Sequence, residues 1–347
     1  MDPIQQAADQ VRDGGHLSRD TAAQLIDAML RGESSDDAIA ALLLALAEKG
    51  ETVDELVGAA QAMRQHMTRI PHRHEVLLDT CGTGGSGSGT FNISTAVAIV
   101  VAACDVAVAK HGNRKATSHS GSADVLECLG VGLESHADEV SARLDRDGLC
   151  FCFAPALHPA MKHVVGVRRR LGVKTLFNLL GPLCNPAAAT HQLLGTSSPA
   201  DQALVAAAMA GLRTKRSMIL HAEDGQDEVS LASPTTILDV SGVGRDQASG
   251  TVKPKTLVLD ASDFGLSPVQ LKDIRAADSP ASAAMIEDLL DGQQGPVRDT
   301  VVAGAAVALL LCDRETELRD AVQCAAAAID DGSARRKLND LRRRVAG

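Results

Sequence analysis

The sequence predicts an α/β protein in which a small all-helical domain precedes a larger domain with a mainly parallel central sheet flanked by helices. Up to about residue 72, apolar residues recur at helical spacing between capping signals. From Val76 onward, short apolar runs alternate with helix-forming segments, which is typical of a parallel sheet with crossover helices. At 347 residues the chain is long enough for two domains, which we place at 1–72 and 73–347.

Three N-terminal helices are delimited by capping residues. Small polar residues can accept hydrogen bonds from the first free N–H groups of a helix, and glycine commonly ends one. The apolar faces of these helices are too broad for three short helices to bury alone. We therefore expect them to pack on each other, on a helical segment near 158–190 and on a second subunit. The caps are Ser18 or Asp20, Ser35, and Thr52 with Glu55 at capping-box spacing, and the stops are Gly32 and Gly50.

The larger domain is predicted from six apolar runs. A helix from about His158 to Arg170 and the FNLLGP segment interrupt the alternation, so we expect them to return to the helical domain. Residues 240–256 are polar and glycine-rich, which predicts a loop or an edge hairpin. The segment 300–345 predicts helices, with a buried alanine-rich stretch and a basic, solvated tail. The predicted strands are VLLD (76–79), VAVA (106–109), CFCFA (150–154), LLGTS (193–197), SMILH (217–221) and TLVLD (256–260).

Composition narrows the class of protein. The chain is 45% hydrophobic yet has no Trp, no Tyr and five Phe, so Ala, Val, Leu and Ile must build its core. Its formal net charge of −10 disfavours nucleic-acid binding over a broad face. Its eight cysteines form no CxxC motif and are interpreted as buried apolar residues in a reducing compartment. No signal peptide or membrane-spanning run is found, so we expect a cytoplasmic protein.

The stretch from Asp79 to Gly130 carries the strongest functional signal. A predicted strand enters a loop with five glycines between Gly82 and Gly89, a helix start follows, and a second strand ends in KHGNR (110–114). Glycine allows the backbone to approach an anion closely, and free N–H groups at a loop and a helix start attract phosphate. The loop is neither a Walker A motif nor a dinucleotide fingerprint. We therefore expect a phosphate-rich ligand of another kind.

Several blocks resemble the anthranilate phosphoribosyltransferase family of tryptophan biosynthesis. They are GTGG-x-G-x-x-TFNIST, KHGNR and SGSADVLE-x-LG, the middle block Ala154–Ala187, the acidic block His221–Ser230, and the C-terminal FGLSPVQLKDI and GPVRDTVVAGAAVALLL. The resemblance spans about residues 15 to 340. It implies transfer of the 5-phosphoribosyl group from phosphoribosyl pyrophosphate (PRPP) to the amino group of anthranilate, with release of pyrophosphate. This is the second step of tryptophan biosynthesis from chorismate. The resemblance also implies a homodimer and Mg²⁺, with two ions per subunit when PRPP is bound.

The resemblance also implies site residues. It assigns anthranilate to Gly82, Asn113 and Arg168, and the metal to Ser94, Asp227 and Glu228, whose oxygens suit Mg²⁺. Pro155 and His158 are expected to line the substrate channel. The residues implied for PRPP are Gly82, Gly85, Ser86, Thr90, Asn92, Ile93, Ser94, Thr95, Lys110, His111, Gly112, Asn113, Arg114, Lys115, Ala116, Thr117, Ser118 and Ser122.

The chemistry needs no catalytic nucleophile. Breaking the C1–O bond develops positive charge on the ribose and negative charge on pyrophosphate, while the aromatic amine already has a lone pair. Positioning and charge neutralisation are therefore expected to supply most of the rate. His111 is interpreted either as a group that orients the amine or accepts its proton, or as a hydrogen-bonded structural histidine.

Three positions depart from the family pattern. Ser86 stands where Asp is usual, Lys115 replaces a hydroxyl, and Gly304 stands where Asn is usual. Two alternative functions remain. A pyrimidine nucleoside phosphorylase has a related loop but needs no Asp-Glu metal pair. A nucleic-acid-binding relative would be basic and would lose the metal or anthranilate residues.

Overall fold

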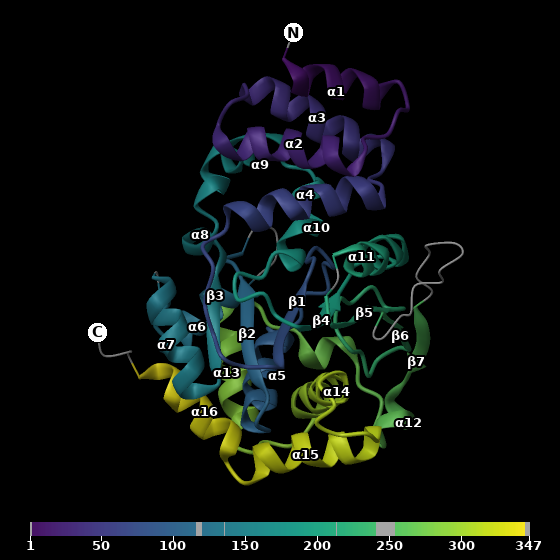
Figure 1. The fold of residues 1–347 in the computed structure, drawn as a ribbon. Coiled ribbons are helices and arrows are strands. Elements are labelled where there is room, and N and C mark those ends of the chain that lie inside the picture. The colour runs from purple at the N-terminus through teal and green to yellow at the C-terminus, as the bar shows by residue number, and fades with distance from the viewer. Residues whose placement is uncertain (1, 116–119, 135, 213, 241–253, 344–347) are drawn as a thin grey trace.

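The computed structural model describes residues 2–115, 120–134, 136–212, 214–240 and 254–343, and Figure 1 shows two domains. A group of helices at the top covers one end of a seven-stranded sheet, which further helices flank on both faces. The predicted fold class is therefore confirmed.

The N-terminal region contains four helices rather than the three we singled out. The missed helix, α1 (Pro3–Arg12), begins after Asp2, whose side chain accepts a hydrogen bond from the Ile4 N–H. The predicted caps of the others are confirmed. Ser18 and Ser35 accept bonds from helical N–H groups, and Thr52 and Glu55 form the reciprocal capping box. The other three helices are α2 (Arg19–Arg31), α3 (Asp36–Lys49) and α4 (Val53–His66).

The middle segment packs against these helices. The helix expected from His158 to Arg170 is instead split into the 3₁₀ helix η1 (Pro159–His163) and α9 (Val165–Leu171). The break reflects the i→i+3 bonds that Met161 and Val164 donate, which wind η1 more tightly than an α-helix. With α10 (Leu176–Leu183), α9 joins the core of the helical domain, where α3 buries Ile39, Leu42, Leu43 and Leu46 within the monomer.

The sheet has the order β3-β2-β1-β4-β5-β6-β7. Strands β1 to β5 are parallel, and β6 is antiparallel to both of its neighbours, β5 and β7. All six predicted strands are present, and β6 was missed. From β1 the chain runs outward to β2 and β3 and then returns to the other side at β4, so the carboxyl ends of β1 and β4 form a topological switch point. The strands are β1 (Leu77–Gly82), β2 (Ala107–Gly112), β3 (Leu149–Phe153), β4 (His191–Gly195), β5 (Arg216–Ala222), β6 (Thr235–Asp239) and β7 (Lys255–Leu259).

Further helices cover the sheet and complete the α/β domain. The loop or hairpin predicted at 240–256 falls largely on residues 241–253, which lie outside the described residues, but β6 and β7 pair at the sheet edge on either side of them. The helices are α5 (Ile93–Ala103), α6 (Ser122–Cys128), α7 (Ala137–Asp147), α8 (Ala154–Leu157), α11 (Pro199–Gly211), α12 (Ala261–Phe264), η2 (Leu271–Ile274), α13 (Ser279–Leu290), α14 (Pro296–Leu311), α15 (Leu318–Asp330) and α16 (Ser333–Arg342).

The packing of α14 explains why position 304 is a glycine. A Cβ added there would lie 2.9 Å from Cγ2 of Val97 on α5, so the two buried helices approach too closely for a larger side chain. The close approach of the two helices therefore accounts for glycine at the position where the family usually has Asn.

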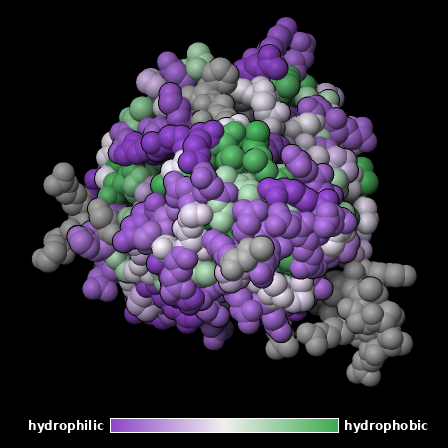
Figure 2. Space-filling model, turned by 90° about the horizontal axis from the view of Figure 1, so that it is seen from above, coloured by the Kyte–Doolittle hydropathy of each residue, from purple (hydrophilic) through white to green (hydrophobic). Residues whose placement is uncertain are grey.

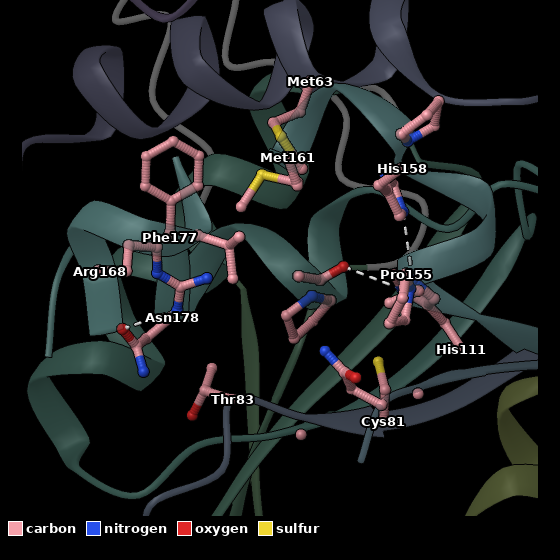
Figure 3. Close-up of a pocket in the computed structure, with 18 of the residues that line it drawn as sticks. Met63, Cys81, Thr83, His111, Pro155, His158, Met161, Arg168, Phe177 and Asn178 are labelled. Carbon is pink, nitrogen blue, oxygen red and sulfur yellow. Dashed lines mark hydrogen bonds between the residues drawn. The ribbon is translucent and has the colours of Figure 1, made fainter. Parts of the chain in front are cut away.

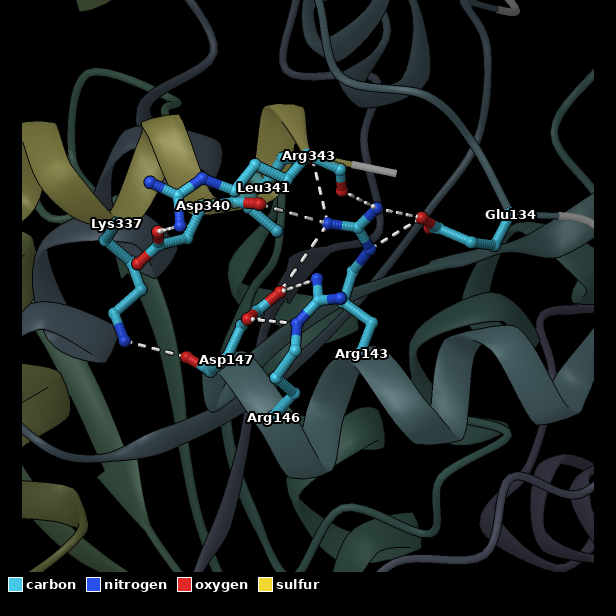
Figure 4. A network of polar contacts seen from close by, with 8 residues as sticks. All are labelled: Glu134, Arg143, Arg146, Asp147, Lys337, Asp340, Leu341 and Arg343. Atoms are coloured by element: carbon cyan, nitrogen blue, oxygen red, sulfur yellow. Dashed lines mark hydrogen bonds and ion pairs between the residues drawn. The ribbon is translucent and has the colours of Figure 1, made fainter. Parts of the chain in front are cut away.

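A buried arginine fastens the C-terminal helix to α7 (Figure 4). Arg143 donates from Nε to Glu134 Oε1 at 2.6 Å, and from its two Nη atoms to the carbonyls of Leu341 and Arg343 at 2.9 Å. These carbonyls are at the end of α16 and lack helical partners. The basic tail is thus partly a docked surface, because Arg335 and Arg342 also pair with Glu287 on α13.

All eight cysteines are free, five of them are buried and Cys128 is exposed. In the described part of the chain, no helix has both the length and the apolar character needed to cross a membrane.

Candidate active site at the carboxyl edge of the sheet

The glycine loop after β1 adopts the backbone that its sequence predicts. Gly84, Gly85, Gly87 and Gly89 have φ values of 69°, 81°, 66° and 68°, which residues with a Cβ rarely adopt. Successive N–H groups in a glycine turn of this kind can form a concave anion-binding surface. This loop is therefore built to approach a phosphate closely.

The far end of the loop is held by a residue that sequence reasoning missed. Arg275 donates from Nε to the Ser88 carbonyl at 3.0 Å, and it forms a β-bridge with Thr90. Within the loop, the hydroxyls of Ser86 and Thr90 each lie 3.2 Å from the Ser88 hydroxyl. Ser86 thus keeps a polar group where the family usually has a carboxylate.

The start of α5 brings several predicted residues to the same edge. Asn92 is used structurally, because its side-chain oxygen accepts bonds from Ser120 and Ser282. Ile93 points into the core and its N–H is bonded to the Phe91 carbonyl. The Thr95 hydroxyl is buried and has no hydrogen-bond partner within the described residues.

Lys110 lies buried beneath the start of α5. Its Nζ donates to the Thr80 carbonyl at 2.6 Å and to Ser94 Oγ at 3.1 Å. Burial lowers the pKa of Lys110, and the Asp79 carboxylate acts against that shift. The lysine is therefore held in place at the end of β2, beside a predicted metal ligand.

The acidic pair lies at the glycine turn, as the predicted site requires. Glu228 Oε1 accepts a bond from the Ser94 N–H at 3.1 Å. Asp227 occupies a notch between the last residues of β1 and β4: a Cβ on Gly82 would fall 2.7 Å from Asp227 Oδ2, and one on Gly195 would overlap the Asp227 carbonyl. Gly195 was not singled out from the sequence, although it pairs with Gly82 in register.

The acidic pair has the chemistry of a cation site. Burial and the neighbouring Asp227 carboxylate raise the pKa of Glu228 to about 8, because two carboxylates in one partly enclosed place repel. A cation would relieve this repulsion. Across the described residues no group of three or more His, Cys, Asp or Glu side chains forms a metal cage. Two carboxylates suit Mg²⁺, which usually keeps water and substrate phosphate as its other ligands.

A cavity of about 490 Å³ adjoins the glycine turn and lies between the two domains (Figure 3). Gly82 is part of both the cavity and the glycine turn, since it lines the cavity and lies against Asp227. Seven predicted residues line this space: Gly82, His111, Gly112, Asn113, Pro155, His158 and Arg168.

Arg168 is held at one wall of the cavity by two neighbours. Its guanidinium lies over the Phe177 ring, 5.5 Å from the centroid, and Nη2 donates to Asn178 Oδ1 at 3.4 Å. Burial lowers the pKa of Arg168. Phe177 and Asn178 were given no role from the sequence, although they belong to the same motif block. Together they orient a planar cation towards the cavity.

His111 and His158 form a pair at another wall. Their Nε2 atoms are 3.2 Å apart, and His111 Nδ1 lies 3.1 Å from the Gly181 carbonyl. Burial lowers the pKa of His111 to about 3 and that of His158 to about 4. Both nitrogens of His111 are thus engaged and the ring is neutral, which favours the structural interpretation of this residue over that of a free base.

The remaining predicted residues follow β2. Arg114 pairs with Glu127 at 2.6 Å, so its charge is already neutralised, and the Lys115 N–H donates to Asp124. The Ser122 hydroxyl donates to the Asn113 carbonyl at 3.3 Å and packs against Gly112. Ala116, Thr117 and Ser118 lie outside the described residues.

Two family models match the chain in the order of its two domains. The model of the glycosyl transferase family helical bundle domain matches residues 5–67, and that of the same family's a/b domain matches residues 74–335. An anthranilate phosphoribosyltransferase from Rhodopirellula baltica is 60% identical over 335 residues, which cover 96% of this chain and 95% of the relative. The chain belongs to the anthranilate phosphoribosyltransferase family.

Solved structures of the anthranilate phosphoribosyltransferase family have the same fold. The Thermus thermophilus enzyme superposes with a TM-score of 0.87 at 36% identity, covering 97% of this chain and 99% of that one. The Saccharomyces cerevisiae enzyme in complex with PRPP and Mg superposes with a TM-score of 0.88 at 25% identity, covering 97% and 96%. The family and the enzymatic activity predicted from the sequence are thereby confirmed.

Proposed function

We propose that this chain binds PRPP on the glycine turn and anthranilate in the adjoining cavity, and transfers the 5-phosphoribosyl group to the anthranilate amine. One observation supports this assignment most strongly. Gly82 joins the two half-sites, because it lines the cavity of Arg168 and also lies against the Asp227 carboxylate.

Anthranilate fits the chemistry of the cavity. It is a flat aromatic acid, and the cavity offers the guanidinium of Arg168 for its carboxylate, with apolar walls from Met63, Met161 and Pro155 for its ring. A guanidinium can bind a carboxylate through two parallel hydrogen bonds. With the carboxylate at Arg168, the amine can point towards Gly82 and the glycine turn.

PRPP fits the edge of the sheet beside the cavity. The left-handed glycines and the α5 N-terminus supply N–H groups for its phosphates, and Lys110 supplies a fixed cation. The residues implied by resemblance at these positions are therefore retained as PRPP-binding residues. Arg114 is expected to contribute mainly through its backbone, since its side chain pairs with Glu127.

The reaction requires positioning more than proton chemistry. The C1–O bond breaks with its electron pair leaving on pyrophosphate, and the amine lone pair forms the new C1–N bond. The amine then loses one proton, which solvent can accept. Neutral His111 and His158 hold the wall of the cavity, while main-chain N–H groups stabilise the charge that develops on pyrophosphate.

Mg²⁺ would be held by Asp227 and Glu228 with Ser94 nearby, and when bound it neutralises the leaving pyrophosphate. Two ions per subunit remain part of the proposal. Ser86 supplies no carboxylate to the loop. We therefore expect Asp227 and Glu228 to be the carboxylates that bind the two ions.

The homodimer, the domain boundary near residue 72 and the cytoplasmic location also remain proposals. Figure 2 shows the face of the molecule seen from above, where a hydrophobic patch lies among hydrophilic residues. Val165, the first residue of α9, and Val173, which follows that helix, are exposed large apolar side chains. Contiguous exposed apolar patches often mark protein–protein interfaces, and this patch is one candidate for the contact between subunits.

The experiment that tests the activity is anthranilate consumption, followed by loss of its fluorescence with PRPP and Mg²⁺ present. We expect the loss to need both additions. Parallel assays with thymidine and phosphate, and with duplex DNA at physiological salt, test the two alternative functions. Nucleoside turnover, or tight DNA binding without anthranilate turnover, would contradict the proposal.

A further inference from the structure

Lys174 lies over the glycine turn although it belongs to the connection between α9 and α10. A Cβ added to Gly85 would lie 2.9 Å from Lys174 Cε and 3.2 Å from its Nζ. The Nζ donates to Ser197 Oγ at 3.1 Å, just beyond the end of β4. A side chain from the helical half of the molecule therefore reaches the loops after both β1 and β4.

The charge of Lys174 is available to a ligand. The side chain is exposed, and within the described residues it forms no ion pair, since its one hydrogen bond goes to a neutral hydroxyl. Glu51 and Asp201 line the same small hollow of about 110 Å³ without pairing with it.

The position of the ammonium group complements the turn below it. Gly84 and Gly85 have positive φ values in a glycine turn, and the successive N–H groups of such a turn can bind an anion. Lys110 is held at the start of α5 instead, where its Nζ donates to the Thr80 carbonyl and to Ser94 Oγ. An anion on the turn would thus meet backbone N–H groups below and the Lys174 charge above.

We propose that Lys174 is a further PRPP-binding residue, which contacts the pyrophosphate group on the glycine turn and links the helical domain to the α/β domain when substrate binds. The inference rests on the proposed function for the identity of the ligand. It adds a cation from the other domain that the sequence motifs did not indicate.

Steady-state kinetics of Lys174→Ala and Lys174→Arg test the inference. A lost hydrogen bond from a charged group predicts that Lys174→Ala raises the KM for PRPP about 10- to 100-fold. Lys174→Arg keeps the charge and is expected to recover most of this loss. The KM for anthranilate should stay within about twofold, because Arg168 and the cavity are untouched.

Arg170→Ala is the matched control. Arg170 is another exposed cation of the same segment, and it pairs with Asp37 on the helical domain instead of facing the turn. We expect this variant to keep the wild-type KM for PRPP. An equal change in both alanine variants would indicate a general charge effect and would overturn the specific role of Lys174.

Direct binding separates this inference from the proposed function. Calorimetric titration with inorganic pyrophosphate and Mg²⁺ should show weaker binding to Lys174→Ala than to the wild type. If the wild type fails to consume anthranilate, the proposed function fails while this titration still tests the lysine. If the wild type is active and Lys174→Ala binds pyrophosphate and PRPP unchanged, the inference alone is wrong.

Discussion

The carboxylate of Asp227 lies against the backbone of Gly82, so that a Cβ on the glycine would fall 2.7 Å from Asp227 Oδ2. This contact links the acidic pair to the cavity, because Gly82 also lines the space in front of Arg168. A phosphate-binding turn, a cation site and a slot for an aromatic acid therefore share one residue.

Gly82→Ala is expected to reduce activity without unfolding the protein. The new methyl group must displace the Asp227 carboxylate, and small misplacements in an active site can cost about 100-fold in rate. Activity assays with increasing Mg²⁺, alongside thermal unfolding, check this. A variant with wild-type turnover at low Mg²⁺ would show that the contact is unimportant.

Arg168→Ala is expected to weaken anthranilate binding much more than PRPP binding. The change removes a charge-assisted bond, so we predict a rise in the KM for anthranilate of at least about tenfold. Asn178→Ala should produce a smaller rise of the same kind, because Asn178 orients the guanidinium from 3.4 Å away. Equal losses for both substrates would remove the proposed role of Arg168.

The buried histidine pair predicts a loss of stability in mild acid. Burial depresses the pKa of His111 to about 3 and that of His158 to about 4, whereas the unfolded chain has the ordinary value near 6.5. Below pH 6.5 the unfolded state therefore binds more protons than the folded state. The contribution of the neutral histidines to the free energy of unfolding is fully present above pH 6.5 and is lost as the pH falls towards 4. The loss is at most about 1.4 kcal/mol per pH unit for each histidine.

Urea unfolding at pH 7.5, 6 and 5 measures this dependence. The free energy of unfolding should decrease across the series for the wild type, and less steeply for His158→Gln, which removes one titrating ring. Identical slopes for the two proteins would rule out the histidine pair as the cause.

Gly304→Ala is expected to destabilise the α/β domain despite the better helix propensity of alanine. Propensity favours alanine by about 1 kcal/mol, but overpacking of a buried interface typically costs about 1–3 kcal/mol. The added Cβ would lie 2.9 Å from Val97 Cγ2. In a Val97→Ala background the same change should become neutral or stabilising, and destabilisation of equal size in both backgrounds would argue against the clash.

The sequence alone was sufficient to predict the helices and strands that are marked by residues close together in the chain. Ser35 and Thr52 marked helix starts, because an N-cap residue bonds to an N–H group in the first turn of the same helix. The six apolar runs marked strands. The short strand β6 was missed because TTILD has little apolar pattern of its own and gains its place from pairing with β5. The glycine loop was anticipated because its backbone requirement is local to the chain.

The missed contributors to the site depend on tertiary contacts. Lys174, Gly195 and Arg275 reach the turn from three separate segments, and no spacing rule connects them with it. The gap that Gly304 provides for Val97 is likewise visible only when α5 and α14 are packed together. Motif resemblance located the blocks, while the structure supplied the residues that bring them together.

The most direct test of the central claim compares the Mg²⁺ dependence of anthranilate consumption in the wild type and in Asp227→Asn. The account predicts that wild-type anthranilate fluorescence falls only when PRPP and Mg²⁺ are both present, and that the variant loses most of this activity or needs much more Mg²⁺. Constant fluorescence in the wild type, or an unchanged Mg²⁺ requirement in the variant, would contradict it.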